Sequence, residues 1–268
     1  MAGTKTMKKK KKKNSSAFWS NLIWLVLFFV AAILMLWSVK QKQANIAGEL
    51  IITVEDLPEG NNLLTEGDVL ERLKKSFVIG LSGLPIGALD VKKIEAVLEE
   101  DPFVKDAEVF ITAKNKVHID LSQRVPLQRV IDGIGEHYYL DETGRKMPLS
   151  DHFTAKVLVA TGAIPPHIPN FLEKPKHALR DLFELTNRVL KDDFLEPMVA
   201  QIHRDEKGSF TLVPIVGNQN IIFGPYEQVE DKFFRLEQFY LKAIPYTGWN
   251  KYKTINLTFK NQVVCEKR

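Results

Sequence analysis

The sequence predicts an α+β protein that is held in a membrane by one N-terminal helix. Three observations predict it: an uncharged stretch at residues 17–39, short β-type runs that alternate with amphipathic helical runs after it, and a single cysteine among 268 residues. The two periodicities, about 2 and about 3.6 residues, distinguish strands from helices. Because Cys265 is alone, no intrachain disulfide can form. The outer part must therefore fold by its own core or with partners.

Residues 17–39 are predicted to form a transmembrane helix. A helix rises about 1.5 Å per residue, so this stretch covers the roughly 30 Å of hydrocarbon in a bilayer. A cleaved signal peptide is the alternative, but its apolar core is usually about 7 to 15 residues long and precedes a small-residue cleavage site. Here the apolar run is longer, and the A-x-x-A sequence formed by Ala44 and Ala47 lies well past it. We therefore expect an anchor that is not cleaved.

The distribution of charge predicts the orientation of this span. Residues 1–16 carry seven lysines and no acid, whereas only Lys40 and Lys42 follow the span closely. The positive-inside bias places this basic tail in the cytoplasm and the rest of the chain outside. The run Lys8–Lys13 is also compatible with an RNA-binding or nuclear-localisation tail. Beside a spanning helix, its simpler role is to set topology and attract anionic lipid.

The outer part is not predicted to bind nucleic acid. The whole chain has 37 basic and 33 acidic residues, and the seven tail lysines account for its positive balance, because they leave 30 basic against 33 acidic residues. Nucleic-acid-binding domains are usually strongly basic. The outer part is slightly acidic instead.

Residues 48–125 are predicted to fold in the order β-α-α-β-β. Thr65, with Asp68 three residues later, is typical of a helix start, and Asp90 can cap a second helix. Pro102 stops that helix because proline lacks the N–H donor and restricts its predecessor. The three strands are expected at residues 49–54, 103–111 and 116–121.

Residues 126–268 are predicted to form a mixed β-sheet domain with helices. The run from Tyr138 to Met147 is typical of a hairpin around a glycine-containing turn. Apolar residues at helical spacing predict two amphipathic helices, at residues 176–190 and 226–240. Further strands are expected at residues 199–203, 210–216 and 220–223, and residues 254–259 have the alternation of a strand.

Two residue strings in the first outer domain resemble a POTRA domain. One is Pro-Phe-Val-Lys-Asp-Ala-Glu-Val, from Pro102 into the second strand. The other is Val-His-Ile-Asp-Leu-Ser-Gln-Arg-Val-Pro, from the third strand to Pro126. With the N-terminal anchor and the element order, they are similar to the FtsQ/DivIB family of bacterial cell-division proteins. That family usually has an acid where Gln123 stands.

The second outer domain continues the resemblance. Asp141 to Gly144, within the predicted hairpin, is similar to the family's Asp-x-x-Gly segment, and Asn220 to Pro225 is similar to its apolar-Gly segment before the last helix. The closing strands depart from the family, which has Asp, Arg and Tyr at three positions where this chain has Asn256, Thr258 and Phe259. The family's charged pairings are therefore not expected there.

The resemblance implies a non-enzymatic scaffold of the division machinery. It implies a single span in the bacterial inner membrane at the division septum, with a cytoplasmic N-terminus and a periplasmic C-terminus. No cofactor and no metal are implied. The implied partners are an FtsB-like protein held to an FtsL-like protein, and the implied role is to help control septal cell-wall synthesis.

The resemblance also implies that the C-terminal region binds the FtsB-like partner by strand addition, because an open sheet edge holds unpaired N–H and C=O groups. We expect residues 254–265 to form the contact, with Phe259 as an aromatic anchor. Alternation favours core roles for Ile255 and Leu257 instead. The strand from Lys116 to Leu121 is a further candidate for pairing. The candidate contact residues are Thr254, Ile255, Asn256, Leu257, Thr258, Phe259, Val263, Val264 and Cys265.

Two other classes of protein share features with this chain. A sortase-type cysteine transpeptidase needs a thiolate, a histidine and an arginine that converge, and Cys265, His203 and Arg268 supply these residue types. However, the residues before the cysteine, Gln262-Val263-Val264, are not the Thr-Leu-x-Thr of that family. A POTRA module of an outer-membrane assembly machine would end in a β-barrel, and the residues after 130 lack the roughly ten-residue alternating segments of one. The six histidines are spread without zinc-ligand spacing.

Overall fold

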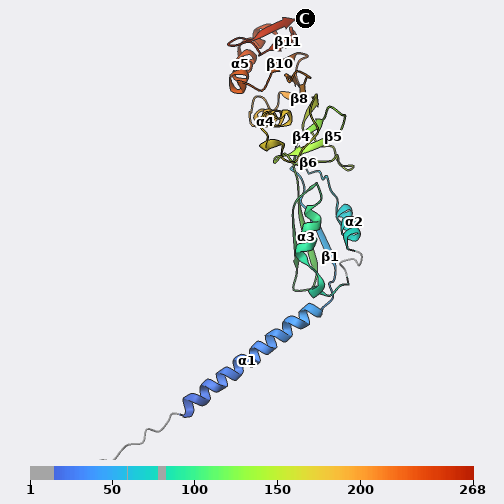
Figure 1. Cartoon of the computed structure of the whole chain (residues 1–268), viewed down its shortest axis with the longest axis vertical. Helices are drawn as coiled ribbons and strands as arrows, with labels where there is room; N and C mark the ends of the chain where they lie inside the picture. Colours follow the sequence, from blue (N-terminus) through green and yellow to red (C-terminus); the bar gives the residue numbers. More distant parts are fainter. Residues whose placement is uncertain (1–14, 59, 78–82) are drawn as a thin grey trace, which may run out of the picture.

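The computed structural model describes residues 15–58, 60–77 and 83–268. Within them the chain forms one long helix, a small sheet with two helices, and a larger sheet with further helices, arranged in a row (Figure 1). The predicted basic tail lies outside the described residues, apart from its last two positions. The predicted α+β class, with one N-terminal helix and two outer parts, is confirmed.

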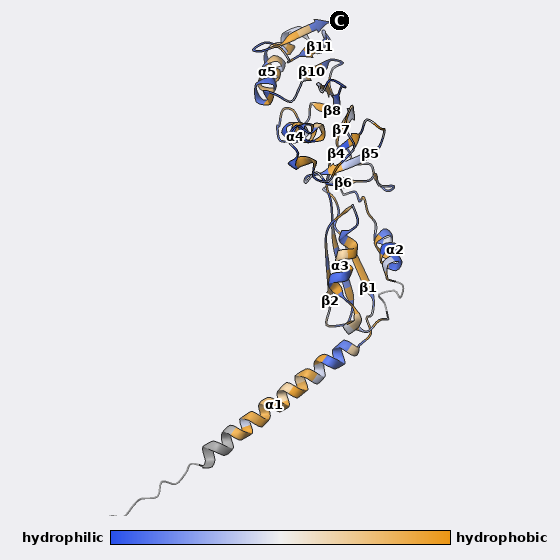
Figure 2. Ribbon diagram, in the orientation of Figure 1, coloured by the Kyte–Doolittle hydropathy of each residue, from blue (hydrophilic) through white to orange (hydrophobic). Residues whose placement is uncertain are grey.

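Helix α1 (Ser15–Ala44) is long and apolar enough to cross a membrane from Leu22 onward, as judged by length and composition. Its apolar side chains from Leu22 are mostly exposed and pack against no other part of the described chain (Figure 2). The helix continues past the apolar run because Gln41 to Ala44 are good helix formers and contain no breaker. Lys40 and Lys42 therefore lie on the helix itself.

The small sheet has the order β1-β3-β2, with β1 (Leu50–Val54) parallel and β2 (Val104–Ile111) antiparallel to the central β3 (Val117–Gln123). Helices α2 (Glu66–Ser76) and α3 (Val91–Glu99) follow β1, with a short 3-10 turn at Ile86–Ala88 between them. The strand from Lys116 to Leu121 is thus paired on both sides. It cannot accept a partner strand, because only β1 and β2 lie at edges of this sheet.

The predicted capping residues start both helices. Thr65 Oγ1 accepts a hydrogen bond from the N–H of Asp68 at 3.3 Å, and Asp68 Oδ2 accepts one from the N–H of Thr65 at 2.8 Å. Asp90 Oδ1 accepts from the N–H of Lys93 at 3.2 Å. These bonds satisfy N–H groups that a helix leaves without partners in its first turn.

The side chain of Gln123 is buried and makes four hydrogen bonds within this domain. Its Oε1 accepts hydrogen bonds from the N–H groups of Leu63 (2.9 Å) and Leu64 (3.1 Å). Its Nε2 donates to Glu55 O at 2.9 Å and to Asn62 Oδ1 at 2.7 Å. A carboxylate could accept the first pair of bonds but could not donate the second pair. The amide therefore fixes the loop before α2 to the end of β3, because its oxygen accepts and its nitrogen donates hydrogen bonds.

The large sheet has nine strands among the described residues, in the order β12-β11-β10-β9-β8-β7-β4-β5-β6. Helices α4 (Ala178–Leu190), α5 (Val229–Lys242) and α6 (Ile244–Thr247) accompany it, with a 3-10 turn at Phe171–Glu173. Its strands are β4 (Pro126–Ile131), β5 (His137–Asp141), β6 (Lys146–Met147), β7 (Leu158–Gly162), β8 (Val199–Arg204), β9 (Phe210–Pro214), β10 (Asn220–Gly224), β11 (Tyr252–Asn256) and β12 (Val264–Lys267).

Two of these strands, β4 and β7, were not predicted from the sequence. They pair in parallel inside the sheet, between β8 and β5, with Gln128 opposite Leu158 and Val130 opposite Ala160. In β4 the inward positions include Pro126 and Gln128, so its alternation between buried and half-buried residues is not an alternation between apolar and polar types. The hydrophobic pattern therefore does not reveal a strand whose buried positions include polar side chains.

Three hairpin turns of the large sheet share one pattern, in which an Asp is followed three residues later by a Gly. Each Asp Oδ1 accepts backbone N–H bonds from residues two and four positions later, and each Gly has φ between 80° and 85°. Glycine is needed there because this left-handed region is costly for other residues. The three pairs are Asp132 with Gly135, Asp141 with Gly144, and Asp205 with Gly208.

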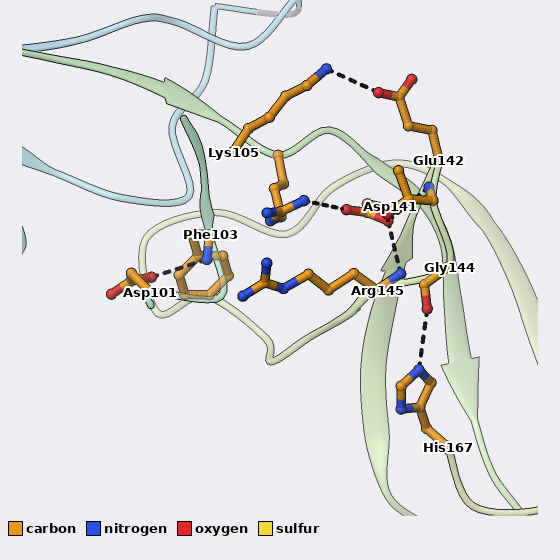
Figure 3. A network of polar contacts seen from close by, with 10 residues as sticks. Asp101, Phe103, Lys105, Asp141, Glu142, Gly144, Arg145 and His167 are labelled. Atoms are coloured by element: carbon orange, nitrogen blue, oxygen red, sulfur yellow. Dashed lines mark hydrogen bonds and ion pairs between the residues drawn. The ribbon is translucent and has the colours of Figure 1, made fainter. Parts of the chain in front are cut away.

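Asp141 also joins the two sheets. Arg124, directly after β3, donates a hydrogen bond from Nη1 to Asp141 Oδ2 at 2.9 Å, and both side chains are largely buried. Figure 3 shows this site, with the N–H of Arg145 on Asp141 and the exposed pair of Lys105 and Glu142 beside it. Burial by itself would raise the pKa of Asp141, but hydrogen bonds from Thr143, from the backbone of Arg145 and from Arg124 outweigh it and lower that pKa.

An apolar cluster reinforces this junction. Leu57 and Leu63 from the first outer part pack with Tyr139 and Met147 of the large sheet. Ser150 Oγ donates to Leu63 O at 2.6 Å across the same boundary. The two sheets are therefore joined by a buried ion pair and by shared core, rather than by a free linker.

We expect Asp141→Asn to destabilise the chain by about 3 kcal/mol, because it leaves the buried guanidinium of Arg124 without its counter-charge. Thermal unfolding of the full-length chain in detergent, followed by near-ultraviolet circular dichroism, measures the loss. Asp205→Asn is the matched control, since Asp205 makes the same turn without an arginine ion pair among the described residues. Equal losses in the two variants would show that the ion pair adds nothing.

The acid dependence of stability gives a second readout of the same variant. Since the folded state lowers the pKa of Asp141, its contribution is complete above the unfolded-state pKa of about 3.9. The contribution is lost as the pH falls through the folded-state pKa. The Asp141→Asn variant should therefore lose less stability than the parent chain over this acidic range.

Candidate functional site at the terminal sheet edge

The large sheet ends in β12, and this edge differs from the edge that the sequence predicted. Strand β11 lies between β10 and β12, so it is parallel to one neighbour and antiparallel to the other. Residues 254–259 therefore do not form an open strand, contrary to the prediction. At this end of the large sheet, the strand with an unpaired side among the described residues is β12.

The hydrogen bonds of β11 fix which way its backbone groups point. The N–H of Leu257 donates to Ile222 O in β10 at 2.9 Å. Successive residues of a strand direct their N–H and C=O groups to opposite sides. The groups of Ile255 therefore also face β10, and those of Thr254 and Asn256 face β12.

The same alternation identifies the open groups of β12. The register across this pair sets Thr254 opposite Glu266, Ile255 opposite Cys265, and Asn256 opposite Val264. The N–H and C=O groups of Glu266 and Val264 thus turn inward to β11. Those of Cys265 and Lys267 turn outward, to the side where the described chain has no paired strand. These outward groups can take one further extended segment.

The predicted contact residues divide into two groups. Ile255 and Leu257 are 0 % exposed, so the interpretation of these two as core residues is confirmed. Their side chains cannot contact a partner without unfolding. Phe259 and Val264 are 45 % and 40 % exposed. The remaining residues are half-buried or lie at the surface: Thr254, Asn256, Thr258, Val263 and Cys265.

Phe259 lies in a turn rather than in a strand. Asn256 Oδ1 accepts hydrogen bonds from the N–H of Thr258 at 2.9 Å and from its Oγ1 at 2.7 Å. This local turn ends β11 at Asn256, because an Asn side chain that binds the backbone two residues on competes with strand pairing. Phe259 is therefore carried out of the alternation that Ile255 and Leu257 follow.

Arg235 in α5 holds this turn against the helix. Its guanidinium donates to the carbonyl oxygens of Leu257 (3.1 Å), Phe259 (2.9 Å) and Gln262. Its Nε also donates to Asp231 at 2.9 Å, one helical turn earlier. The position of β12 thus depends on a side chain from a different element.

Sequence reasoning missed this role of Arg235. Its spacing of four residues from Asp231 indicates only an ordinary ion pair on a helix surface. Backbone carbonyls carry no sequence signal, so nothing in the chain indicated that three of them meet this arginine. The helix around it also exposes apolar side chains, Phe234 and Leu241, with Tyr246 and Trp249 just beyond.

The residues of the sortase-type alternative do not converge. His203 is on β8, four strands away from Cys265 on β12, or about 19 Å at the usual strand spacing. Burial raises the pKa of the Cys265 thiol, which is opposite to what a nucleophile needs. Arg268 instead donates a hydrogen bond to Asn218 O at 2.6 Å, so its guanidinium is held away from Cys265 by another partner.

We expect Arg235→Gln to loosen the turn and β12 while the rest of the sheet stays folded. The variant loses charge-assisted bonds to three carbonyl groups, so we expect a local loss of about 2 kcal/mol. Hydrogen exchange of the amides of residues 255–267 in the full-length chain would then accelerate about thirtyfold, if exchange follows local opening. Lys242→Gln, an exposed change on the same helix, is the control. Uniform acceleration across the whole sheet would contradict a local role.

Comparison with known families agrees with this architecture. A model described as FtsQ/DivIB, C-terminal related, matches residues 125–266, and a POTRA-like domain model matches residues 45–122. No curated protein matches the chain. The first of these models covers more than half of the chain. The chain therefore belongs to the FtsQ/DivIB family, whose members are in general non-enzymatic scaffold proteins of bacterial cell division.

Proposed function

We propose that this chain captures an extended segment of a division partner on the open edge of β12. The observation that carries the proposal is the outward direction of the N–H and C=O groups of Cys265 and Lys267. Backbone pairing of this kind gives affinity with little dependence on side chains. Membership of the FtsQ/DivIB family supports a protein of the division machinery as the occupant.

The partner that we propose is an FtsB-like protein held to an FtsL-like protein. An added strand would continue the sheet, so its side chain beside Cys265 would lie on the face that Ile255 and α5 bury. Its next side chain would lie beside Val264 or Glu266 on the opposite face. The partner segment should therefore alternate between apolar and polar residues.

We propose Phe259 as an aromatic contact at one end of this strand. It lies in the turn that leads into β12, and its backbone is held by Arg235. A large apolar side chain fixed at an exposed position loses little conformational freedom on binding. Phe259 would then limit how far the added strand can slide along β12.

The proposed arrangement across the membrane places this edge outside the cytoplasm. Residues 1–16 are the cytoplasmic tail, residues 17–39 the span, residues 48–125 the POTRA domain and residues 126–268 the partner-binding domain. The seven lysines of the tail support this orientation. By holding its partners beyond the membrane at the septum, the chain helps to control septal wall synthesis.

We expect Lys267→Pro to weaken binding of the FtsB-like and FtsL-like proteins of the same cell about tenfold. Proline removes the outward N–H and its ring crowds the edge, while the inward bonds to β11 remain. Co-purification with the full-length chain over a range of partner concentrations measures the change. Lys267→Ala is the matched control and should bind like the parent chain. Unchanged binding by the proline variant would exclude this edge.

We expect Phe259→Ala to weaken the same binding by about fivefold and to leave thermal unfolding unchanged. The side chain is 45 % exposed and lies in a turn, so its loss opens no cavity. Phe210→Ala, a change at a buried phenylalanine of β9, should instead lower the unfolding temperature. A fall in unfolding temperature for Phe259→Ala would assign this residue to the core.

A further inference from the structure

The base of the small domain is fixed to the end of α1. The N–H of Ile86 donates to Asn45 O, the N–H of Ala47 to Leu84 O, and the N–H of Gly48 to Asn115 O, each at 2.8 Å. A Cβ added at Gly87 would lie 3.0 Å from Gln43 Cβ, so backbone and helix meet closely there. The loop before α3 and the turn between β2 and β3 therefore lie where α1 ends (Figure 1).

Lysines gather at this base from α1, α2, α3 and the region where β2 turns into β3. Helix α3 starts there, with Lys92 and Lys93 in its first turn. Helix α2 ends there, because Lys93 Nζ lies 5.9 Å from the ring of Phe77 at the end of α2. The eight lysines of the base are Lys40, Lys42, Lys74, Lys75, Lys92, Lys93, Lys114 and Lys116.

Few acids compensate these charges. Lys75 pairs with Glu71 at 2.7 Å, and Lys116 pairs with Glu49 at 2.6 Å. The other six lysines are exposed and form no ion pair with a described residue. Lys92 and Lys93 even occupy the first turn of a helix, where the helix dipole disfavours cations. Ion pairing between described residues therefore does not account for these six charges.

Eight of the fourteen described acids of the small domain gather at its opposite end, whereas two, Glu49 and Asp90, lie at the base. These eight acids occupy the end of β1, the start of α2, the end of α3 and the start of β2, which all lie away from α1. The domain is therefore polarised, with a basic end beside the membrane helix and an acidic end beyond it. The eight acids at this end are Glu55, Asp56, Glu66, Asp68, Glu99, Glu100, Asp101 and Asp106.

We propose that the lysines of the base hold the domain on the anionic phospholipid headgroups of the membrane that α1 crosses. Attraction of lysine to an anionic lipid surface falls off within a Debye length, about 8 Å at physiological ionic strength. The hydrogen-bonded junction at Asn45 to Gly48 keeps the base within a few residues of the end of α1. The surface that these charges meet first is therefore the headgroup layer itself.

This docking sets the direction in which the molecule leaves the membrane. The acidic end of the small domain then points away from the lipid, and the large sheet follows it (Figure 1). The inference rests on α1 spanning a membrane. It does not depend on partner capture by β12, so either proposal can fail without the other.

Energy transfer in lipid nanodiscs tests this docking with the full-length chain. Cys265→Ser together with Ala113→Cys leaves one thiol, beside Lys114 at the base, for a donor dye. The discs contain an acceptor dye on a trace lipid, in phosphatidylcholine alone or mixed with phosphatidylglycerol. We expect higher transfer in the anionic discs. We expect this increase to vanish at about 1 M salt, where the Debye length falls to about 3 Å.

The lysines are tested by a fourfold variant and a matched control. Lys74→Gln, Lys92→Gln, Lys93→Gln and Lys114→Gln together should abolish most of the increase. The control carries Lys191→Gln, Lys207→Gln, Lys242→Gln and Lys251→Gln, all exposed in the large-sheet part, and should keep it. Equal transfer in both kinds of disc would overturn the proposal, and so would an increase that survives in the base variant or is lost equally in the control. The salt measurement uses the labelled chain with all its lysines, so it tests the proposal even if the base variant misfolds.

Discussion

The buried ion pair between Arg124 and Asp141 is the contact on which the arrangement of the molecule depends. Asp141 closes a hairpin turn of the large sheet, and the same carboxylate receives the arginine that directly follows the small sheet. A buried charge pair costs desolvation and is worth keeping only where several hydrogen bonds compensate it. Here four donors do so, from Thr143, Arg145 and Arg124. The two sheets therefore form one continuous body.

This continuity relates the two ends of the molecule. The lysine-rich end of the small domain lies beside the end of α1. Strand β12 lies at the edge of the large sheet that is farther from α1 (Figure 1). A flexible junction would let the open edge sweep through the space near the membrane. A rigid junction holds that edge at a constant distance from the end of α1.

An open strand edge such as that of β12 can cause aggregation. Unpaired edges invite aggregation, and proteins usually protect them with charges and with short strands. Strand β12 has four residues, including Glu266 and Lys267, and the opposite edge strand β6 has two. Arg235 also restrains this edge strand, because it donates hydrogen bonds to three carbonyl groups of the turn before β12. The edge is thus available to a partner yet restrained in position.

The sequence by itself determined the local structure. The apolar length of α1, the caps at Thr65 and Asp90, the strict alternation of β3 and the burial of Ile255 and Leu257 all follow from side-chain type and spacing. These features depend on neighbours within a few residues. The family resemblance, which rests on short strings and element order, likewise needed no coordinates.

Only the tertiary structure decided which edge is open. Strands β4 and β7 escaped prediction because buried Gln128 and a short, small-residue run do not show the usual alternation. The order of strands placed β11 inside the sheet and β12 at its edge, and it set Cys265 far from His203. Arg235 donates hydrogen bonds to backbone carbonyl groups, and Arg124 donates one to a carboxylate. In both cases the partners are distant in the sequence. Such contacts are set by how elements pack, and a one-dimensional pattern of residue types does not contain that information.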